Sequence, residues 1–215
     1  MQHSDLKYIN KIGCELEGSW DNCPYDLIQD VSVVIDDAIY EGETNSPPLC
    51  YEDLVKWIKN NTPNKVNSTC GLHVHVSLHR TKDYIRLMEK GFNSFFLVYM
   101  EKWGTETMKF PKKHVFWERY NSENRFCLKD FNPDEQVNLK NKGNARRTHL
   151  NYCYALHGTI ECRLFPAFNK SDSIIKCVEA YVDCIESYLS SVKEFEDEKP
   201  VEICVPFDTT DLITV

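Results

Sequence analysis

The amino-acid sequence predicts a single α+β domain with a mostly antiparallel sheet. Its 215 residues are 42% hydrophobic and 12% aromatic, which is enough to fill a sizeable core. Alternating apolar and polar residues are typical of strands that bury one face, whereas apolar residues at steps of three and four are typical of amphipathic helices. Along the chain the two patterns follow one another in the order β-β-β-α-β-α-loop-β-β-α, which indicates the α+β class.

The first quarter of the chain is predicted to form three strands and a short helix. By residue number, the strands are 8–17, 31–35 and 38–44, and the helix is 51–60. Ser46-Pro47-Pro48 ends the third strand because proline cannot donate to a strand ladder. Thr62-Pro63-Asn64 ends the helix.

Residues 70–78 predict a strand with two different faces. Side chains two apart on a strand share a face. His73, His75 and Ser77 therefore point one way, and the apolar residues between them point the other way. Imidazole is a common transition-metal ligand and titrates near neutral pH, so this strand is the first candidate for a functional site.

The second half of the chain begins with a helix predicted over residues 82–103, where apolar residues recur at helical steps. Residues 104–147 lack a clear period and are long for a connection, which predicts a functional lid or a mobile loop. The remaining predicted elements are strands at 148–156 and 159–165, a helix at 172–192, and a C-terminal tail, 194–215, outside the domain of residues 1–193.

The net charge of −8 argues against a general nucleic-acid binder and against attraction to anionic membranes. Residues 104–147 are the exception, because they carry ten Lys or Arg against six Asp or Glu, while the rest of the chain carries −12. Such asymmetry can steer a phosphate-bearing ligand to one region, although a solvated loop of accidental sign explains the charge equally well.

None of the ten cysteines is spaced from another as in a zinc knuckle or a redox motif. We expect free core thiols in a reducing compartment rather than a disulfide framework, and hence a cytoplasmic protein. The N-terminal residues do not resemble a signal peptide. The most apolar run, residues 95–100, is far too short for the roughly 20 residues of a membrane-spanning helix.

Three pairs of functional side chains have the spacing that places both members on one face of a strand. They are Glu15-x-Glu17, His73-x-His75 and Glu161-x-Arg163. Taken alone, each pair has an ordinary explanation, as a solvated face or as core histidines. Together, on strands that could belong to one sheet, they favour a common site.

Carboxylates bind hard divalent cations through oxygen, and Mg²⁺ also keeps waters and substrate phosphates among its ligands. Two such ions can hold the oxygens of a phosphoryl group during transfer. Arginine binds phosphate or carboxylate through two parallel hydrogen bonds. Because the clustered carboxylates would repel one another, we expect a site of this kind to hold metal.

Four motifs lie in order along the chain: residues 12–17 (Ile-Gly-Cys-Glu-Leu-Glu), residues 43–49 (an acidic residue followed by Ser-Pro-Pro), residues 71–75 (Gly-Leu-His-Val-His), and Arg147, Asn151 and residues 159–165 (Thr-Ile-Glu-Cys-Arg-Leu-Phe). The ordered set resembles the amidoligase family of the carboxylate–amine ligase superfamily, which includes glutamine synthetase and glutamate–cysteine ligase. No single motif is specific. Cys14 departs from the aliphatic residue that family members often have there.

The resemblance implies a curved antiparallel sheet, the glutamine-synthetase-like half-barrel, with the active site on its concave face. It implies ATP and Mg²⁺ or Mn²⁺ as cofactors. The implied metal ligands are Glu15, His73 and Glu161 for one ion, and Glu17 with Glu43 for the other. The implied catalytic residues are Arg163, Arg147 and His75, and the implied nucleotide-binding residues are Arg146, Arg147, Lys113 and Arg125.

The implied reaction is ATP-dependent formation of an amide. ATP phosphorylates a carboxylate to an acyl phosphate, an amine attacks, and phosphate leaves. The substrates are a carboxylate and an amine supplied by an amino acid, a peptide or a protein tail.

Two other hypotheses remain open from the sequence. One is a catalytically inactive ATP- or peptide-binding module on the same fold. The other is a metal-dependent hydrolase or oxygenase that uses His73 and His75 directly, although the residues after His75 do not supply the carboxylate that jelly-roll enzymes of this kind need.

Overall fold

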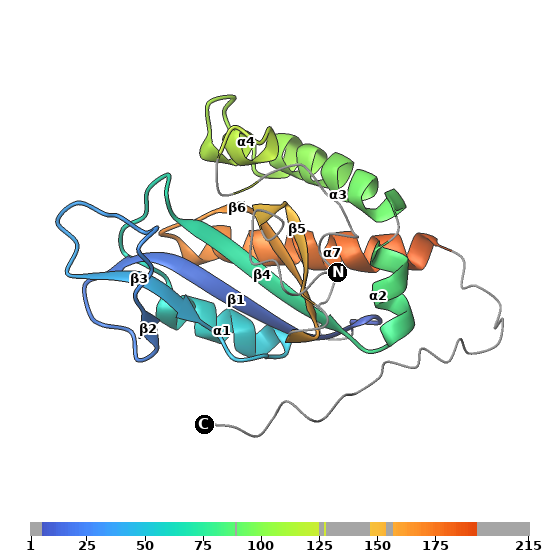
Figure 1. The fold of residues 1–215 in the computed structure, drawn as a ribbon, viewed down its shortest axis with the longest axis horizontal. Helices are drawn as coiled ribbons and strands as arrows, with labels where there is room; N and C mark the ends of the chain where they lie inside the picture. Colours follow the sequence, from blue (N-terminus) through green and yellow to red (C-terminus); the bar gives the residue numbers. More distant parts are fainter. Residues whose placement is uncertain (1–5, 89, 125–126, 128–146, 154–156, 193–215) are drawn as a thin grey trace, which may run out of the picture.

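The computed structural model describes residues 6–88, 90–124, 127, 147–153 and 157–192. One open six-stranded antiparallel sheet runs through the described residues in the order β2-β3-β1-β4-β6-β5 (Figure 1). The strands are β1 (Ile9–Trp20), β2 (Leu27–Ile28), β3 (Tyr40–Asn45), β4 (Gly71–Leu78), β5 (Leu150–Cys153) and β6 (Thr159–Pro166). The predicted α+β class with an antiparallel sheet is confirmed.

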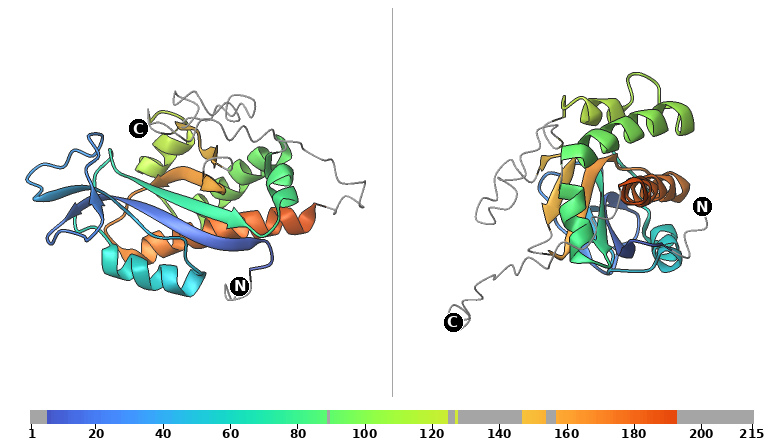
Figure 2. Two further views of the ribbon diagram at one scale, coloured as in Figure 1. Left: turned by 60° about the horizontal axis from the view of Figure 1, so that its bottom comes forward. Right: turned by 90° about the vertical axis from the view of Figure 1, so that its right-hand side faces the viewer.

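The described helices are α1 (Tyr51–Asn61), α2 (Thr81–Met88), α3 (Lys90–Lys102), a one-turn π-helix η1 (Trp103–Thr107), α4 (Val115–Tyr120) and α7 (Ser171–Ser191). Helices α1 and α7 lie together on one face of the sheet, and the opposite face is turned toward the viewer in Figure 1 (Figure 2, right). Helix α3 packs along α7, and α4 packs against β6.

The hydrophobic core lies between the sheet and α1, α3 and α7. It takes the alternate apolar residues of the central strands: Ile12, Cys14 and Leu16 of β1, Leu72, Val74 and Val76 of β4, and Ile160, Cys162 and Leu164 of β6. Burying one such aliphatic side chain contributes roughly 1.5–3 kcal/mol. The other residues of the same strands are thereby held on the opposite face, which stays polar.

The nine described cysteines are free thiols, and six of them are buried, as expected for core thiols. None of the helices within the described residues has both the length and the apolar character needed to cross a bilayer.

The strand predicted at residues 31–35 is wrong. The Asp30 carboxylate accepts from the backbone N–H of Ser32 at 2.8 Å, and the Asp30 carbonyl oxygen accepts from the N–H of Val33 at 3.1 Å, so this segment forms turns. Val33 is buried, whereas Val31 is 98% exposed, so the β-branched run does not form a buried strand face. The strand that precedes β3 is β2, which spans only two residues.

The helix predicted over 82–103 is two helices, α2 and α3, that run in different directions (Figure 1). The helical period of the apolar residues continues through both, so the pattern does not reveal the break. Residues 104–124 are not the loop that the sequence predicted, because they include most of η1 and all of α4. The rest of the predicted loop lies outside the described residues except for Cys127 and Arg147.

The other predicted elements match within a few residues: β1 is longer than predicted, and α1, β4, β6 and α7 lie where they were expected. Strand β5 is shorter than the predicted 148–156, of which 154–156 lie outside the described residues. The predicted tail, 194–215, also lies outside them.

A buried carboxylate of α7 fastens the start of β1. Glu186 accepts hydrogen bonds from the backbone N–H groups of Lys7 (3.3 Å), Tyr8 (2.9 Å) and Ile9 (3.1 Å). Hydrogen bonds to a charged group are worth roughly 1.5–3 kcal/mol each, and buried N–H groups without an acceptor are costly. This cluster sets the position of β1 relative to the helix layer.

We expect Glu186→Ala to lower the free energy of unfolding by about 3 kcal/mol in urea denaturation, since it leaves three backbone N–H groups without their acceptor. Lys176→Ala is the matched control, because Lys176 is exposed on the same helix, and it should change the value by less than about 0.5 kcal/mol. Equal stability of the two variants would contradict the anchoring role.

Candidate functional site

The three predicted pairs lie on one face of three adjacent strands, β1, β4 and β6. In the register, Glu15 stands opposite His73, and His75 stands opposite Glu161. On its other side Glu15 stands opposite Asn45 of β3, so Asn45, Glu15 and His73 form one row across three strands. Directly opposed side chains on one face are in contact range, so the register alone gathers these groups.

A bulge in the β4–β6 pairing lies beside the arginine of the third pair. Leu72 pairs with Phe165 and Val74 pairs with Cys162, so β6 has one more residue than β4 between these pairs. Bulges of this kind redirect side chains. Leu164 and Phe165 are both buried in the core, whereas Arg163 lies on the polar face, where its guanidinium donates to the Glu161 carboxylate.

Glu15 is the centre of the cluster. One of its carboxylate oxygens lies 2.7 Å from His73 Nδ1, and the other lies 2.9 Å from His75 Nε2. Burial alone would raise the pKa of Glu15, but the hydrogen bonds from His73 and His75 outweigh it and hold this pKa far below the usual range. Glu15 is therefore a carboxylate over the whole physiological range of pH.

Glu161 is buried and has several partners. Besides Arg163, its carboxylate accepts from Asn151 Nδ2 at 2.8 Å and from Cys153 Sγ at 3.7 Å. Burial by itself raises the pKa of Glu161, but the charges of Arg163 and His73 lower it below the ordinary value. For Arg163, burial opposes the charged form, yet Glu161 raises its pKa above the ordinary value. The pair is thus ionised, with Glu161 buried and Arg163 partly buried.

His73 lies between two groups of carboxylates. Its Nδ1 faces Glu15 and lies 3.6 Å from Glu161, and its Nε2 lies 3.7 Å from Glu17. Glu17 in turn accepts from the backbone N–H of Gly71. A Cβ on Gly71 would lie 3.0 Å from His73 Nε2, so glycine lets the imidazole approach the start of β4.

A second acidic group adjoins the first on the β3 side. Glu17 pairs with Glu43 across β1 and β3, and Asp30 completes a set whose carboxylate oxygens lie within 4.8 Å of one another. Burial, together with the charges of Glu15 and Glu17, raises the pKa of Glu43, although Asn45 donates to it at 3.0 Å. Like charges at this spacing favour a cation between them.

A buried arginine from α4 lies behind the site. Arg119 is only 1% exposed and donates to the carbonyl oxygens of Cys70 (3.0 Å) and Arg163 (3.2 Å), so it ties the start of β4 to β6 at the bulge. Burial lowers the pKa of Arg119, and the charge of Glu17 acts against this.

The donor set suits a divalent metal. Glu15, His75 and Glu161 offer one ligand atom each, all within 4.8 Å of one another, and Glu17, Asp30 and Glu43 form the second such set. Two carboxylates with one imidazole suit Mn²⁺ as well as Mg²⁺. The first set contains His75 where the sequence predicted His73, and the second adds Asp30, which was not predicted.

Of the predicted nucleotide-binding residues, Lys113 and Arg147 belong to the described part of the chain, and neither lines the pocket described below. Lys113 is exposed just before α4, and Arg147 is partly exposed just before β5. Arg125 and Arg146 lie outside the described residues.

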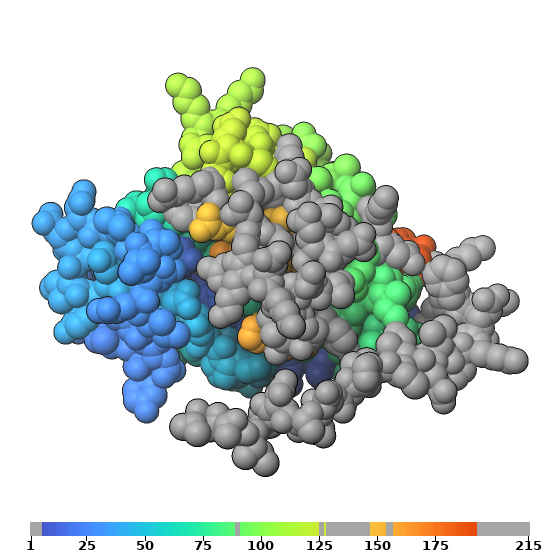
Figure 3. Space-filling model, in the orientation of Figure 1, coloured from blue at the N-terminus to red at the C-terminus, as the bar shows by residue number. Residues whose placement is uncertain are grey.

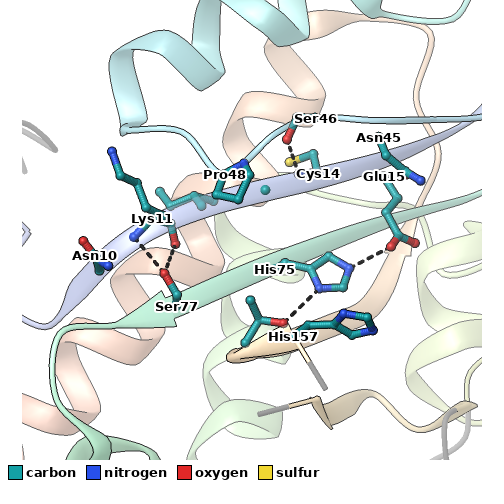
Figure 4. Close-up of a pocket in the computed structure, with 13 residues that line it drawn as sticks. Asn10, Lys11, Cys14, Glu15, Asn45, Ser46, Pro48, His75, Ser77 and His157 are labelled. Atoms are coloured by element: carbon teal, nitrogen blue, oxygen red, sulfur yellow. Dashed lines mark hydrogen bonds and ion pairs between the residues drawn. The ribbon is translucent and has the colours of Figure 1, made fainter. Parts of the chain in front are cut away.

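A pocket of ≈ 550 Å³ opens beside the cluster along β1, with Glu15 and Asn45 at one end and Asn10, Lys11 and Ser77 at the other (Figure 4). His75 lies between the two ends, where its Nδ1 is 3.3 Å from Thr159 Oγ1. In the space-filling view, the segment that carries β2 and β3 forms the left side of the molecule (Figure 3).

Four residues of the site were missed from the sequence: Asp30, Asn45, Arg119 and Cys153. Asn45 and Cys153 each have strand spacing with a predicted partner, Glu43 and Asn151 respectively, so a period of two could have found them. Asp30 follows a two-residue strand, and Arg119 comes from a segment without a clear period, so neither carries such a signal.

Comparisons with protein-family models, with curated proteins and with solved structures found no match to this chain. The resemblance to amidoligases therefore stays a prediction that rests on the motifs, as does the cytoplasmic location.

Protons and a metal ion compete for His75. Burial lowers the pKa of His75, but the hydrogen bond that His75 donates to Glu15 and the charge of Glu161 outweigh it and raise this pKa above the ordinary value. Because a metal binds only the neutral imidazole, Mn²⁺ affinity should rise with pH up to the raised pKa of His75, by at most about tenfold per pH unit, and then level off. Electron paramagnetic resonance of free Mn²⁺ between pH 6 and 9 measures this.

The matched variants are His75→Gln and, at an exposed position just after β4, His79→Gln. The first should weaken Mn²⁺ binding and flatten the pH dependence, and the second should leave both unchanged. An unchanged pH dependence in His75→Gln would rule out His75 as a ligand.

Proposed function

We propose that the protein is an ATP-dependent carboxylate–amine ligase that forms an amide through an acyl phosphate. The observation that carries this proposal is the convergence of Glu15, His75, Glu161 and Arg163 on one polar sheet face. The motifs that resemble the amidoligase family supply these same residues. From the same resemblance we also propose that the sheet has the fold of a glutamine-synthetase-like half-barrel.

In this proposal Glu15, His75 and Glu161 hold one divalent ion, and Glu17, Asp30 and Glu43 hold the second. Bound cations would offset the negative charge of the phosphoryl oxygens. Glu161 and Asn151 hold each other by a hydrogen bond, which keeps the Glu161 carboxylate oriented. His73 contacts both carboxylate groups and fixes their spacing.

Arg163 is suited to binding an anionic reactant. It keeps its charge because Glu161 raises its pKa, and its Nε is buried with no hydrogen-bond partner among the described residues. We assign to it the substrate carboxylate or the phosphoryl group in transfer. Fixed donors directed at such charge usually give the largest catalytic contribution.

The proposed reaction has two steps. A carboxylate oxygen attacks the γ-phosphorus of ATP, an O–P bond forms, and the P–O bond to ADP breaks. The amine nitrogen then attacks the carbonyl carbon of the acyl phosphate, a C–N bond forms, and the C–O bond to phosphate breaks. Phosphate leaves with the electron pair, and the nitrogen releases a proton to solvent.

A metal-dependent hydrolase is the second candidate, favoured by the imidazole and two carboxylates of the first metal set. Such an enzyme would cleave its substrate without nucleotide. A requirement for ATP therefore separates the two candidates, and ATP binding without turnover would identify the inactive module.

Incubation with ATP, Mg²⁺ and pools of amino acids and peptides should release ADP and phosphate in equal amounts, together with a new amide detected by mass spectrometry. Glu15→Gln should lower this rate by about 100-fold or more, because it removes a charged ligand at the centre of the site. Glu52→Gln, an exposed change on α1, is the control. Absence of any ATP-dependent product, or full activity of Glu15→Gln, would refute the proposed function.

A further inference from the structure

The pocket along β1 has opposite hydrogen-bonding character at its two ends (Figure 4). The end at Glu15 and Asn45 presents oxygen acceptors next to the candidate metal groups. The other end is lined by Lys11, which carries an ammonium group, and by Asn10 with its amide. A ligand that fits both ends must carry a donor at one end and an anion at the other.

The acceptor end contains a buried oxygen without a partner. Asn45 stands opposite Glu15 across β1 and β3, and its Nδ2 donates to Glu43 at 3.0 Å. Its Oδ1 is buried and has no hydrogen-bond partner among the described residues. A buried polar atom without a partner costs roughly 1–3 kcal/mol. An N–H group of a ligand would satisfy Asn45 Oδ1, and in the metal-free protein the Glu15 carboxylate beside it favours a charged amine.

A bulge in β1 produces the donor end. Ile9 pairs with Leu78 and Lys11 pairs with Ser77, so Asn10 is the extra residue. Two consecutive polar residues, Asn10 and Lys11, therefore line the pocket, while Ile9 stays in the core. Lys11 is the one Lys or Arg among the described residues that line the pocket.

The middle of the pocket is open because of Gly13. A Cβ built on Gly13 would approach no other atom more closely than 3.6 Å, the distance to Ser46 Oγ, so packing does not require glycine here. A glycine inside a strand that packing does not require is typical of a place where a ligand approaches the backbone. Any larger side chain at this position would reach into the pocket between its two ends.

We propose that this pocket binds the amine substrate of the ligase as a short peptide, with its N-terminal amine at Asn45, next to Glu15, and its C-terminal carboxylate at Lys11. The role as amine substrate rests on the proposed function. At about 3.3 Å per residue, β1 separates Lys11 from Glu15 by roughly 13 Å. Three extended residues span roughly 10–11 Å, and the long lysine side chain covers the remainder. A free amino acid, whose amine and carboxylate share one carbon, cannot reach both ends.

The composition of the pocket favours a peptide over the nucleotide. The described lining residues include no Phe, Tyr or Trp on which an adenine would stack, and a single lysine is a poor match for the charge of a triphosphate. One ammonium group does match one carboxylate.

Isothermal titration calorimetry without nucleotide or divalent metal tests the pocket with three probes: trialanine, trialanine with a C-terminal amide, and N-acetyl-trialanine. Trialanine should bind at least tenfold more tightly than either blocked peptide, because each block removes one of the two charged ends. No binding of trialanine, or equal binding of all three peptides, would overturn the inference.

Variants identify the two ends. Lys11→Gln should weaken trialanine to the affinity of its C-terminal amide and leave the amide unaffected. Gly13→Val should weaken every probe while retaining Mn²⁺ binding, which reports an intact fold. Lys59→Gln, an exposed change on α1 away from the pocket, should change nothing. Retention of the preference for the free carboxylate in Lys11→Gln would overturn the assignment.

The proposed peptide site and the proposed ligase activity can be refuted independently of each other. Trialanine binding without any ATP-dependent product would support the peptide site and refute the ligase. ATP-dependent amide formation with an amine that does not compete with trialanine would support the ligase and overturn the assignment of this pocket.

Discussion

The carboxylate of Glu15, shared between His73 and His75, is the interaction on which the rest of the site depends. This interaction joins β1 to β4 through side chains, in addition to the backbone hydrogen bonds of the sheet, and it keeps Glu15 ionised in a partly buried position. Burying a charge costs several kcal/mol unless it is paired with good geometry. The two imidazoles provide that pairing. His73 also lies 3.7 Å from Glu17 and 3.6 Å from Glu161, so its position constrains these two carboxylates as well.

The core holds the polar face in position. Because the central strands bury their alternate residues against α1, α3 and α7, a slip of one residue in any pairing would move the whole set of functional side chains to the wrong face. The bulges in β1 and β6 break this alternation, and a basic side chain of the polar face, Lys11 or Arg163, lies beside each. The fold thus specifies an acidic centre with one cation at each of two bulges.

Much of this arrangement could be predicted from the sequence, because the period of a strand is two. Glu15, Glu17, His73, His75, Glu161 and Arg163 share a face for that reason alone. The neighbours of each strand, and hence the meeting of Glu15 with both histidines, depend on long-range pairing that no local pattern records. The same holds for Arg119, which reaches the sheet from α4. At residues 31–35 the local pattern itself is misleading, because the β-branched run predicts a strand, whereas the Asp30 side chain stabilises a turn.

Under the proposed function, the polar face of β1, β4 and β6 is a metal-dependent phosphoryl-transfer site. It is tested most directly by anomalous diffraction from crystals grown with Mn²⁺ and a non-hydrolysable ATP analogue. We expect one Mn²⁺ peak bounded by Glu15, His75 and Glu161, a second beside Glu17 and Glu43, and the phosphates of the analogue in contact with both. Manganese bound only at exposed carboxylates elsewhere, with His75 still hydrogen-bonded to Glu15, would contradict it.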